Sequence, residues 1–293
     1  MSEVVSLLIE PFGYPFMTRA LAAAVIVGVV CPILGTYVVL RGMAFFGDAL
    51  AHIILPGVVI AFLLGWPLVL GALIVGVFAA LLIGYISKQS DIKEDAAIGV
   101  VFAGAFALGV ALISLQRSYA VDLTHILFGD LLGVTNSDLW FMAALAIVVL
   151  LTIFAFYKEF LVLSFDPLLA STLRLPVTFL QYLLLVLLSL VIVLSIRAVG
   201  VALVIAMLVT PASAAYLITR RLPTMMVLGA CMGVTSAVVG LLLSFYLDIA
   251  SGPAIVLVET AIFAIVFIFA PRRGVLGTRL RAHKESASSQ KLV

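Results

Sequence analysis

The sequence predicts an all-α polytopic membrane protein with about nine transmembrane helices. Hydrophobic residues make up 65% of the 293 positions and charged residues 10%, and the mean hydropathy is +1.36. A soluble domain is nearer half apolar and a quarter charged. Long, almost uncharged runs repeat from end to end, and the run at 183–193 does not alternate as the strand of a membrane barrel would.

The individual spans follow from the length of the apolar runs, because a span needs about 20 apolar residues. We expect spans at 17–39, 50–65, 67–87, 96–115, 139–157, 177–196, 199–218, 224–247 and 252–270. The second and third runs are separated only by Gly65, Trp66 and Pro67, which is a tight-turn signal. If these two runs formed a single crossing the protein would have eight spans, and this alternative stays open.

The basic residues distinguish the two faces of the membrane. With nine spans and the C-terminus inside, Arg19, Arg117 and Arg197 fall on the outer side and the other Lys and Arg residues fall on inner segments, as the positive-inside rule expects. We therefore expect residues 1–274 to form the transmembrane domain, and 275–293 to form a basic, partly disordered tail in the cytoplasm. The net charge of +2 gives no reason to expect nucleic acid as a partner.

The inner connection at 158–176 contains a helix-start signal. Asp166 is suited to cap a helix whose first turn begins with Pro167, and Pro176 would end that helix before the next span. A short, capped helix on the cytoplasmic face is suited to docking a partner protein. An ordinary interfacial connector is an equally well supported alternative.

The segment R-G-M-A-F-F-G-D-A-L-A-H at 41–52 places an acid and an imidazole in this apolar chain. Asp48 and His52 are four residues apart, so on a helix they would share one face about 6 Å apart. The glycines of the segment and Pro56 after it indicate a broken or re-entrant helix. Such an interruption is tolerated in a membrane only where protein or water surrounds the backbone.

This pair of side chains is suited to a divalent transition metal. Carboxylate and imidazole favour Mn²⁺, Zn²⁺ or Fe²⁺ over Mg²⁺ or Ca²⁺, which prefer oxygen ligands. Two ligands from one chain are too few, whereas two copies about a twofold axis would supply two Asp and two His. The alternative is that Asp48 pairs with Arg41 while His52 binds a backbone carbonyl.

A second acid, Glu259, lies in the middle of an apolar run, where a carboxylate is energetically costly. We interpret it as a structural partner for a hydroxyl such as Thr210 or Ser213. A possible secondary polar site, acting as an ion stop or a proton acceptor, is the alternative.

Three segments resemble one family. The segment L-R-G-M-A-F-F-G-D-A-L-A-H-I-I-L-P-G-V at 40–58 resembles the signature of membrane permeases from bacterial ABC importers for manganese, zinc and iron. The runs at 199–215 and 251–257 are similar to two further segments of that family, in the expected order. The matches are spread over nearly the whole chain.

The resemblance implies an ABC importer permease fold of the metal-chelate/vitamin B12 importer type in the bacterial plasma (inner) membrane. Its partners would be a second copy of itself, a cytoplasmic ABC ATPase dimer and an extracytoplasmic metal-binding solute-binding protein. Asp48 and His52 would be the metal ligands of the translocation path. The transported ion would be Mn²⁺ or Zn²⁺, possibly Fe²⁺, with no permanently bound cofactor. The chain would be a transport subunit and not an enzyme, because ATP hydrolysis belongs to the partner.

The resemblance also implies that the connection at 158–176 is the ATPase-coupling loop. The residues in register with the family are Asp166, Pro167, Ala170, Leu173 and Pro176. Arg174 stands where the family pattern has a glycine, so the geometry of the loop is expected to differ there.

Two other functions remain to be weighed. A gradient-driven, proton-coupled metal carrier would work without an ATPase and would use Glu259 as a proton acceptor. An intramembrane metal-dependent hydrolase would need a fuller ligand set such as H-E-x-x-H, which the sequence lacks. The sequence also lacks a G-x-x-x-x-G-K-[ST] run, so active transport would depend on an ion gradient or a separate ATPase.

Overall fold

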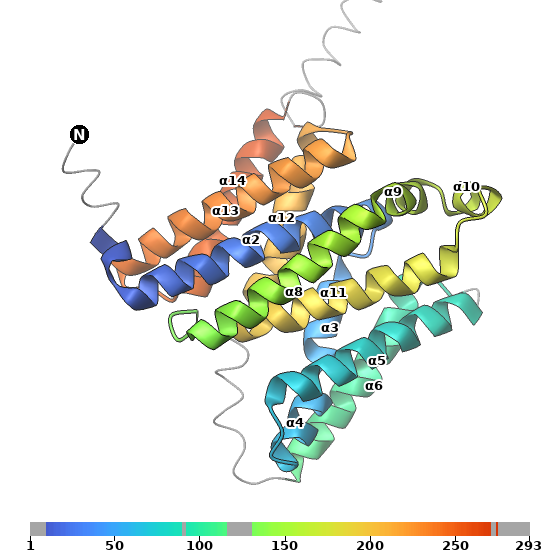
Figure 1. Ribbon diagram of the computed structural model, residues 1–293, viewed down its shortest axis with the longest axis horizontal. Coiled ribbons are helices and arrows are strands. Elements are labelled where there is room, and N and C mark those ends of the chain that lie inside the picture. The colour runs from blue at the N-terminus through green and yellow to red at the C-terminus, as the bar shows by residue number, and fades with distance from the viewer. Residues whose placement is uncertain (1–9, 90–91, 116–130, 271–273, 275–293) are drawn as a thin grey trace, which may run out of the picture.

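The computed structural model describes residues 10–89, 92–115, 131–270 and 274, and these residues form helices and turns with no strand among them. The helices are η1 (Glu10–Gly13), α2 (Pro15–Arg41), α3 (Phe45–Ile53), α4 (Leu55–Leu63), α5 (Leu68–Gln89), α6 (Glu94–Ser114), α8 (Asn136–Ala155), α9 (Tyr157–Phe165), α10 (Pro167–Thr172), α11 (Val177–Val199), α12 (Val201–Ile218), α13 (Leu222–Leu247) and α14 (Ser251–Phe269) (Figure 1). The predicted tail at 275–293 lies outside the described residues.

The all-α membrane prediction is confirmed, and the count of nine spans is approximate. Among the described residues, seven helical segments are long and apolar enough to cross a membrane: α2, α3 with α4, α5, α6, α8, α13 and α14. α11 and α12 contain shorter apolar stretches, Val177–Val193 and Leu203–Ile218. Every predicted span therefore coincides with a helix or with a broken helix.

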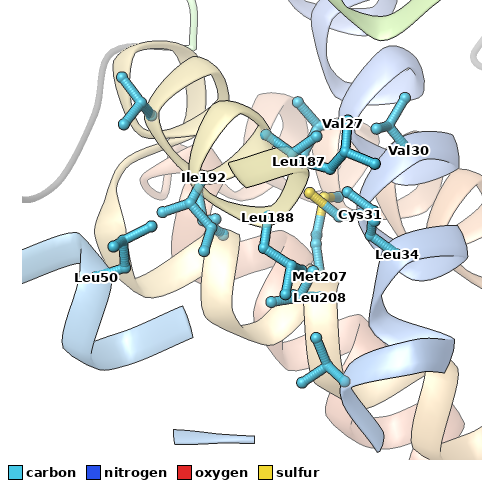
Figure 2. Close-up of a cluster of buried hydrophobic side chains, with 14 of the residues drawn as sticks. Val27, Val30, Cys31, Leu34, Leu50, Leu187, Leu188, Ile192, Met207 and Leu208 are labelled. Atoms are coloured by element: carbon cyan, nitrogen blue, oxygen red, sulfur yellow. The ribbon is translucent and has the colours of Figure 1, made fainter. Parts of the chain in front are cut away.

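The helices form two groups that meet along α11 and α12. α2 packs against α12 and α13, and α14 packs against the same two helices. On the other side, α4 and α5 pack together, and α3 and α4 pack against α6 (Figure 1). Figure 2 shows the buried core between the groups, where Leu50 of α3 lies near Ile192 of α11, and Cys31 of α2 lies near Leu188 of α11 and Met207 of α12.

The runs predicted at 50–65 and 67–87 form an antiparallel hairpin. Gly65 has a left-handed φ of 67° in the turn between α4 and α5. A Cβ at Gly57 would collide with the carbonyl oxygen of Gly71, so the two helix backbones approach closely. These runs are therefore two separate helical segments, each long and apolar enough to cross a membrane.

The ends of the helices agree with this topology. Arg41 at the end of α2 bonds to Glu94 at the start of α6, and Glu94 lines a cavity of about 220 Å³ together with Lys88 at the end of α5. Leu40, next to Arg41, lines a second cavity of about 410 Å³ together with Arg220 between α12 and α13. The segments predicted to share the inner side thus gather at one end of the bundle.

The inner connection begins as predicted. α9 ends at Phe165, and the side chain of Asp166 accepts hydrogen bonds from the backbone N–H groups of Leu168 and Leu169 at 2.9 and 3.0 Å. Pro167 is the first residue of α10. Asp166 therefore caps a short helix, as its sequence position indicated.

The predicted end of that helix is wrong. α10 ends at Thr172, and Pro176 instead occupies the N-cap position of α11. The helix stops early because Arg174 adopts a left-handed conformation, with φ of 57°. In this conformation the N–H of Leu175 donates to the carbonyl of Ala170 at 3.1 Å, which closes the C-terminal turn.

Candidate metal centre

Asp48 and His52 are placed by the turn that separates α2 from α3. Gly42 ends α2 with a left-handed φ of 72°, a conformation that a residue without a Cβ adopts at little cost. The chain turns there, and α3 begins at Phe45. Asp48 consequently lies in the first turn of α3 and His52 in its last turn.

A helix break follows the pair directly. Pro56 has no N–H and cannot donate to the carbonyl of His52 one turn earlier, so the helix is interrupted at Ile54 and continues as α4. The broken-helix prediction is confirmed. α3 and α4 together form a broken segment of 19 residues, Phe45–Leu63, that is long and apolar enough to cross a membrane.

The two side chains face each other at a distance suited to a shared ion. Nε2 of His52 lies 3.7 Å from Oδ1 of Asp48, and the side chains are 30% and 41% exposed. Two ligand atoms about 2.1 Å from one ion are about 3.4 Å apart at the tetrahedral angle. One cation therefore fits between them with a small adjustment, and it would be reached from the surface of the chain.

The alternative pairing of Asp48 with Arg41 is wrong. Nη2 of Arg41 donates to Oε1 of Glu94 at 2.6 Å, in a partly buried ion pair. Within the described part of the chain, the only ion pair of Asp48 is the one with His52. Its carboxylate is therefore available to a cation.

Aromatic residues surround the imidazole on the α6 side. The ring of His52 lies 5.9 Å from that of Phe102 and 5.7 Å from that of Phe106, at steep interplanar angles of 64° and 81°. Phe102 also contacts Phe45 at 6.0 Å. Sequence reasoning missed these rings. Their i, i+4 spacing on a predicted span placed them on one face, but nothing in the sequence paired that face with α3.

One chain supplies an incomplete site. Among the described residues, no three His, Cys, Asp or Glu side chains come together as potential metal ligands. Asp48 and His52 provide one oxygen and one nitrogen ligand type, whereas a metal site usually takes four ligands or more. The remaining ligands must come from water or from another molecule.

Glu259 belongs to a different environment. It lies on α14 and is 2% exposed, and neither of its carboxylate oxygens has a hydrogen-bond partner among the described residues. The expected hydrogen bond to Thr210 or Ser213 is not formed. The structure therefore does not bring Glu259 together with Asp48 and His52.

The predicted coupling residues cluster on α10 and its C-terminal turn. Ala170 is buried, while Leu168, Leu169 and Leu173 are exposed although their side chains are large and apolar. Figure 1 shows α9 and α10 at one extremity of the bundle. This short helix thus presents an apolar surface that nothing else in the described chain covers.

Comparison with known proteins identifies the family. Residues 13–270 match the ABC 3 transport family. The chain is 47% identical over 293 residues to the manganese transport system membrane protein MntC of Halalkalibacterium halodurans, covering 99% of this chain and 100% of the relative. It is 45% identical over 269 residues to the chelated iron transport system membrane protein YfeD of Yersinia pestis, covering 92% of this chain and 90% of the relative.

Solved structures agree with the fold. PsaBC from Streptococcus pneumoniae in complex with Fab contains a chain that is 39% identical, with a TM-score of 0.82 and coverage of 94% of this chain and 99% of that chain. A structure described as an inward-facing metal-chelate type ABC transporter has a TM-score of 0.69 at 15% identity and 85% and 84% coverage, which supports the fold alone.

Family membership also settles the class of protein, since the family consists of membrane transport subunits whose ATP hydrolysis is carried out by a separate protein. The many apolar helices, together with membership of this family, place the chain in the plasma membrane. The chain belongs to the ABC 3 transport family and is a membrane permease, not an enzyme.

Proposed function

We propose that this chain is the membrane-spanning permease of an ATP-driven importer for a divalent transition metal. The observation that carries the proposal is the pair Asp48 and His52, one helical turn apart on α3, partly exposed, with ligand atoms 3.7 Å apart. An ionisable pair within a span marks a transport path more often than a structural contact. The family assignment supports this interpretation.

A second copy of the chain completes the proposed site. Each protomer supplies one Asp and one His, so two protomers about a twofold axis supply four ligands. The partial exposure of both side chains supports this arrangement, because the pair opens on the surface of the chain and not into its core. Helix movements would then expose the shared ion to each side of the membrane in turn.

Mn²⁺ is the transported ion that we favour. Relatives described as manganese transport proteins include MntC and, at 42% identity, ScaB of Streptococcus gordonii. YfeD is described as a chelated iron transport protein, so Fe²⁺ is the first alternative, followed by Zn²⁺. Asp and His ligands accept all three ions.

The energy comes from a separate ATPase dimer that docks on α10. The exposed Leu168, Leu169 and Leu173 provide the apolar contact surface, and the cap at Asp166 fixes its orientation. This end of the bundle holds the basic inner segments, so it faces the cytoplasm, as does the C-terminus. A solute-binding protein delivers the ion on the opposite face.

The experiment is uptake of Mn²⁺ by vesicles that contain the permease with its ATPase. We expect uptake to need ATP and to continue when the proton gradient is dissipated. Uptake by the permease alone, driven by a proton gradient, would instead support the carrier that works without an ATPase.

A further inference from the structure

The ion pair between Arg41 and Glu94 joins segments that are 53 residues apart in the chain. It measures 2.6 Å, and the side chains are only 8% and 27% exposed. Hydrogen bonds between charged groups are about twice as strong as neutral ones, and partial burial reduces screening by solvent. Nη1 of Arg41 is buried without a hydrogen-bond partner among the described residues, so Glu94 is the principal polar anchor of this guanidinium.

The ion pair joins the end of α2 to the start of α6, and both of these positions lead into the metal centre. Arg41 is the last residue of α2, directly before the turn at Gly42 that leads into α3. Glu94 is the first residue of α6. The ion pair therefore ties the start of α6 to the start of the segment that carries Asp48.

A second contact of α6, in this case with α3, lies beside the metal ligands. At 1.5 Å per residue, Phe102 and Phe106 lie about 12 and 18 Å along α6 from Glu94. Their rings pack against the imidazole of His52. A slip of α6 by one residue would move both rings by about 1.5 Å and rotate them by about 100°, away from the imidazole.

We propose that Arg41 and Glu94 are positioning residues for metal transport, acting as a clasp that holds α6 in register with α3. The clasp keeps the two phenylalanine rings against His52, and the rings keep the imidazole beside Asp48. This inference rests on the proposed function, because the quantity it controls is the affinity of the Asp48 and His52 site for the ion.

A structural role of the Arg41–Glu94 pair and a purely electrostatic role of its charges predict different effects of the two substitutions on cation binding. If Glu94 acted only through its charge, Glu94→Gln would weaken cation binding and Arg41→Gln would strengthen it. If the pair acts as a clasp, both substitutions weaken binding, because either one releases α6. Loss of an interaction that orients a metal ligand typically lowers metal affinity about 10- to 100-fold.

The test is equilibrium Mn²⁺ binding to the complete permease–ATPase complex, measured from the electron paramagnetic resonance signal of free Mn²⁺. We expect Arg41→Gln and Glu94→Gln each to weaken binding about 10-fold. Arg41→Lys, which retains the pair, and the exchange Arg41→Glu with Glu94→Arg should recover most of the affinity. Asp95→Asn is the matched control, since Asp95 is exposed beside Glu94 and forms no ion pair among the described residues.

Tighter binding by Arg41→Gln, or unchanged binding by Glu94→Gln, would overturn the clasp. Weakened binding in both single variants that Arg41→Lys does not recover would also overturn it. Asp48→Ala, measured in parallel, separates this inference from the proposed function. If Asp48→Ala binds Mn²⁺ like the wild type, the site assignment fails. If Asp48→Ala loses binding while both clasp variants retain it, the clasp alone fails.

Discussion

Asp48 and Glu259 are both acids within apolar spans, but the structure gives them opposite surroundings. Asp48 is 41% exposed on a broken helix, with an imidazole 3.7 Å away. Glu259 is 2% exposed on an unbroken helix, and its oxygens have no hydrogen-bond partner in the described chain. An intramembrane acid is therefore a candidate site only where it has both a second ligand and a route to its ion.

The largest expected effect concerns the exposed pair. We expect Asp48→Ala and His52→Ala each to reduce ATP-dependent Mn²⁺ uptake about 100-fold or more, because each removes two of the four proposed ligands of a dimer. Uptake of radioactive Mn²⁺ and Zn²⁺ by reconstituted vesicles measures this effect, with Asp95→Asn as the control. Undiminished uptake of both ions in either variant would contradict the assignment of Asp48 and His52 as metal ligands, and Asp48 would then not differ from Glu259 in function.

The buried acid should behave in the opposite way. We expect Glu259→Leu to change Mn²⁺ uptake by no more than about twofold and to raise the free energy of unfolding by about 2 kcal/mol, because an apolar side chain replaces an unpartnered polar one. Thermal unfolding of the purified complex, followed alongside uptake, measures both quantities. A loss of uptake as large as that of Asp48→Ala would place Glu259 in the transport path.

The smallest effect is expected at a position remote from both acids. Arg174 has φ of 57°, a conformation that costs a residue with a Cβ about 1 kcal/mol. Arg174→Gly should raise the unfolding temperature slightly, whereas Arg174→Ala, which keeps a Cβ, should not. Neither change should alter Mn²⁺ affinity. A changed Mn²⁺ affinity in Arg174→Gly would contradict this prediction. It would show that residues outside the metal centre also control Mn²⁺ binding.

Much of the fold was predictable because the bilayer imposes simple rules on sequence. The apolar runs predicted the positions of the membrane helices, and Asp166 followed by Pro167 predicted the start of α10. The end of α10 was not predictable, because it depends on the backbone conformation of Arg174 and not on the nearby proline. The sequence did not decide whether residues 50–87 form one helical segment or two. That distinction became visible only in the close contact between the backbones of Gly57 and Gly71.

The candidate site was predictable only in part. The i, i+4 spacing of Asp48 and His52 follows from helix geometry, so the sequence was sufficient to pair them. The partner of Arg41 was not predictable, because Glu94 is 53 residues away and nearer acids were available. The packing of Phe102 on His52 depends on how α3 and α6 contact each other. A sequence pattern shows which residues share one face of a helix, but it does not show which other helix packs against that face.

The central claim, a metal site shared by two copies of the chain, is tested most directly by the stoichiometry of bound Mn²⁺. Equilibrium dialysis of the purified complex should yield one ion for every two permease chains. Both Asp48→Ala and His52→Ala should lose that ion. One ion for every single chain, or full binding by either variant, would contradict the shared site.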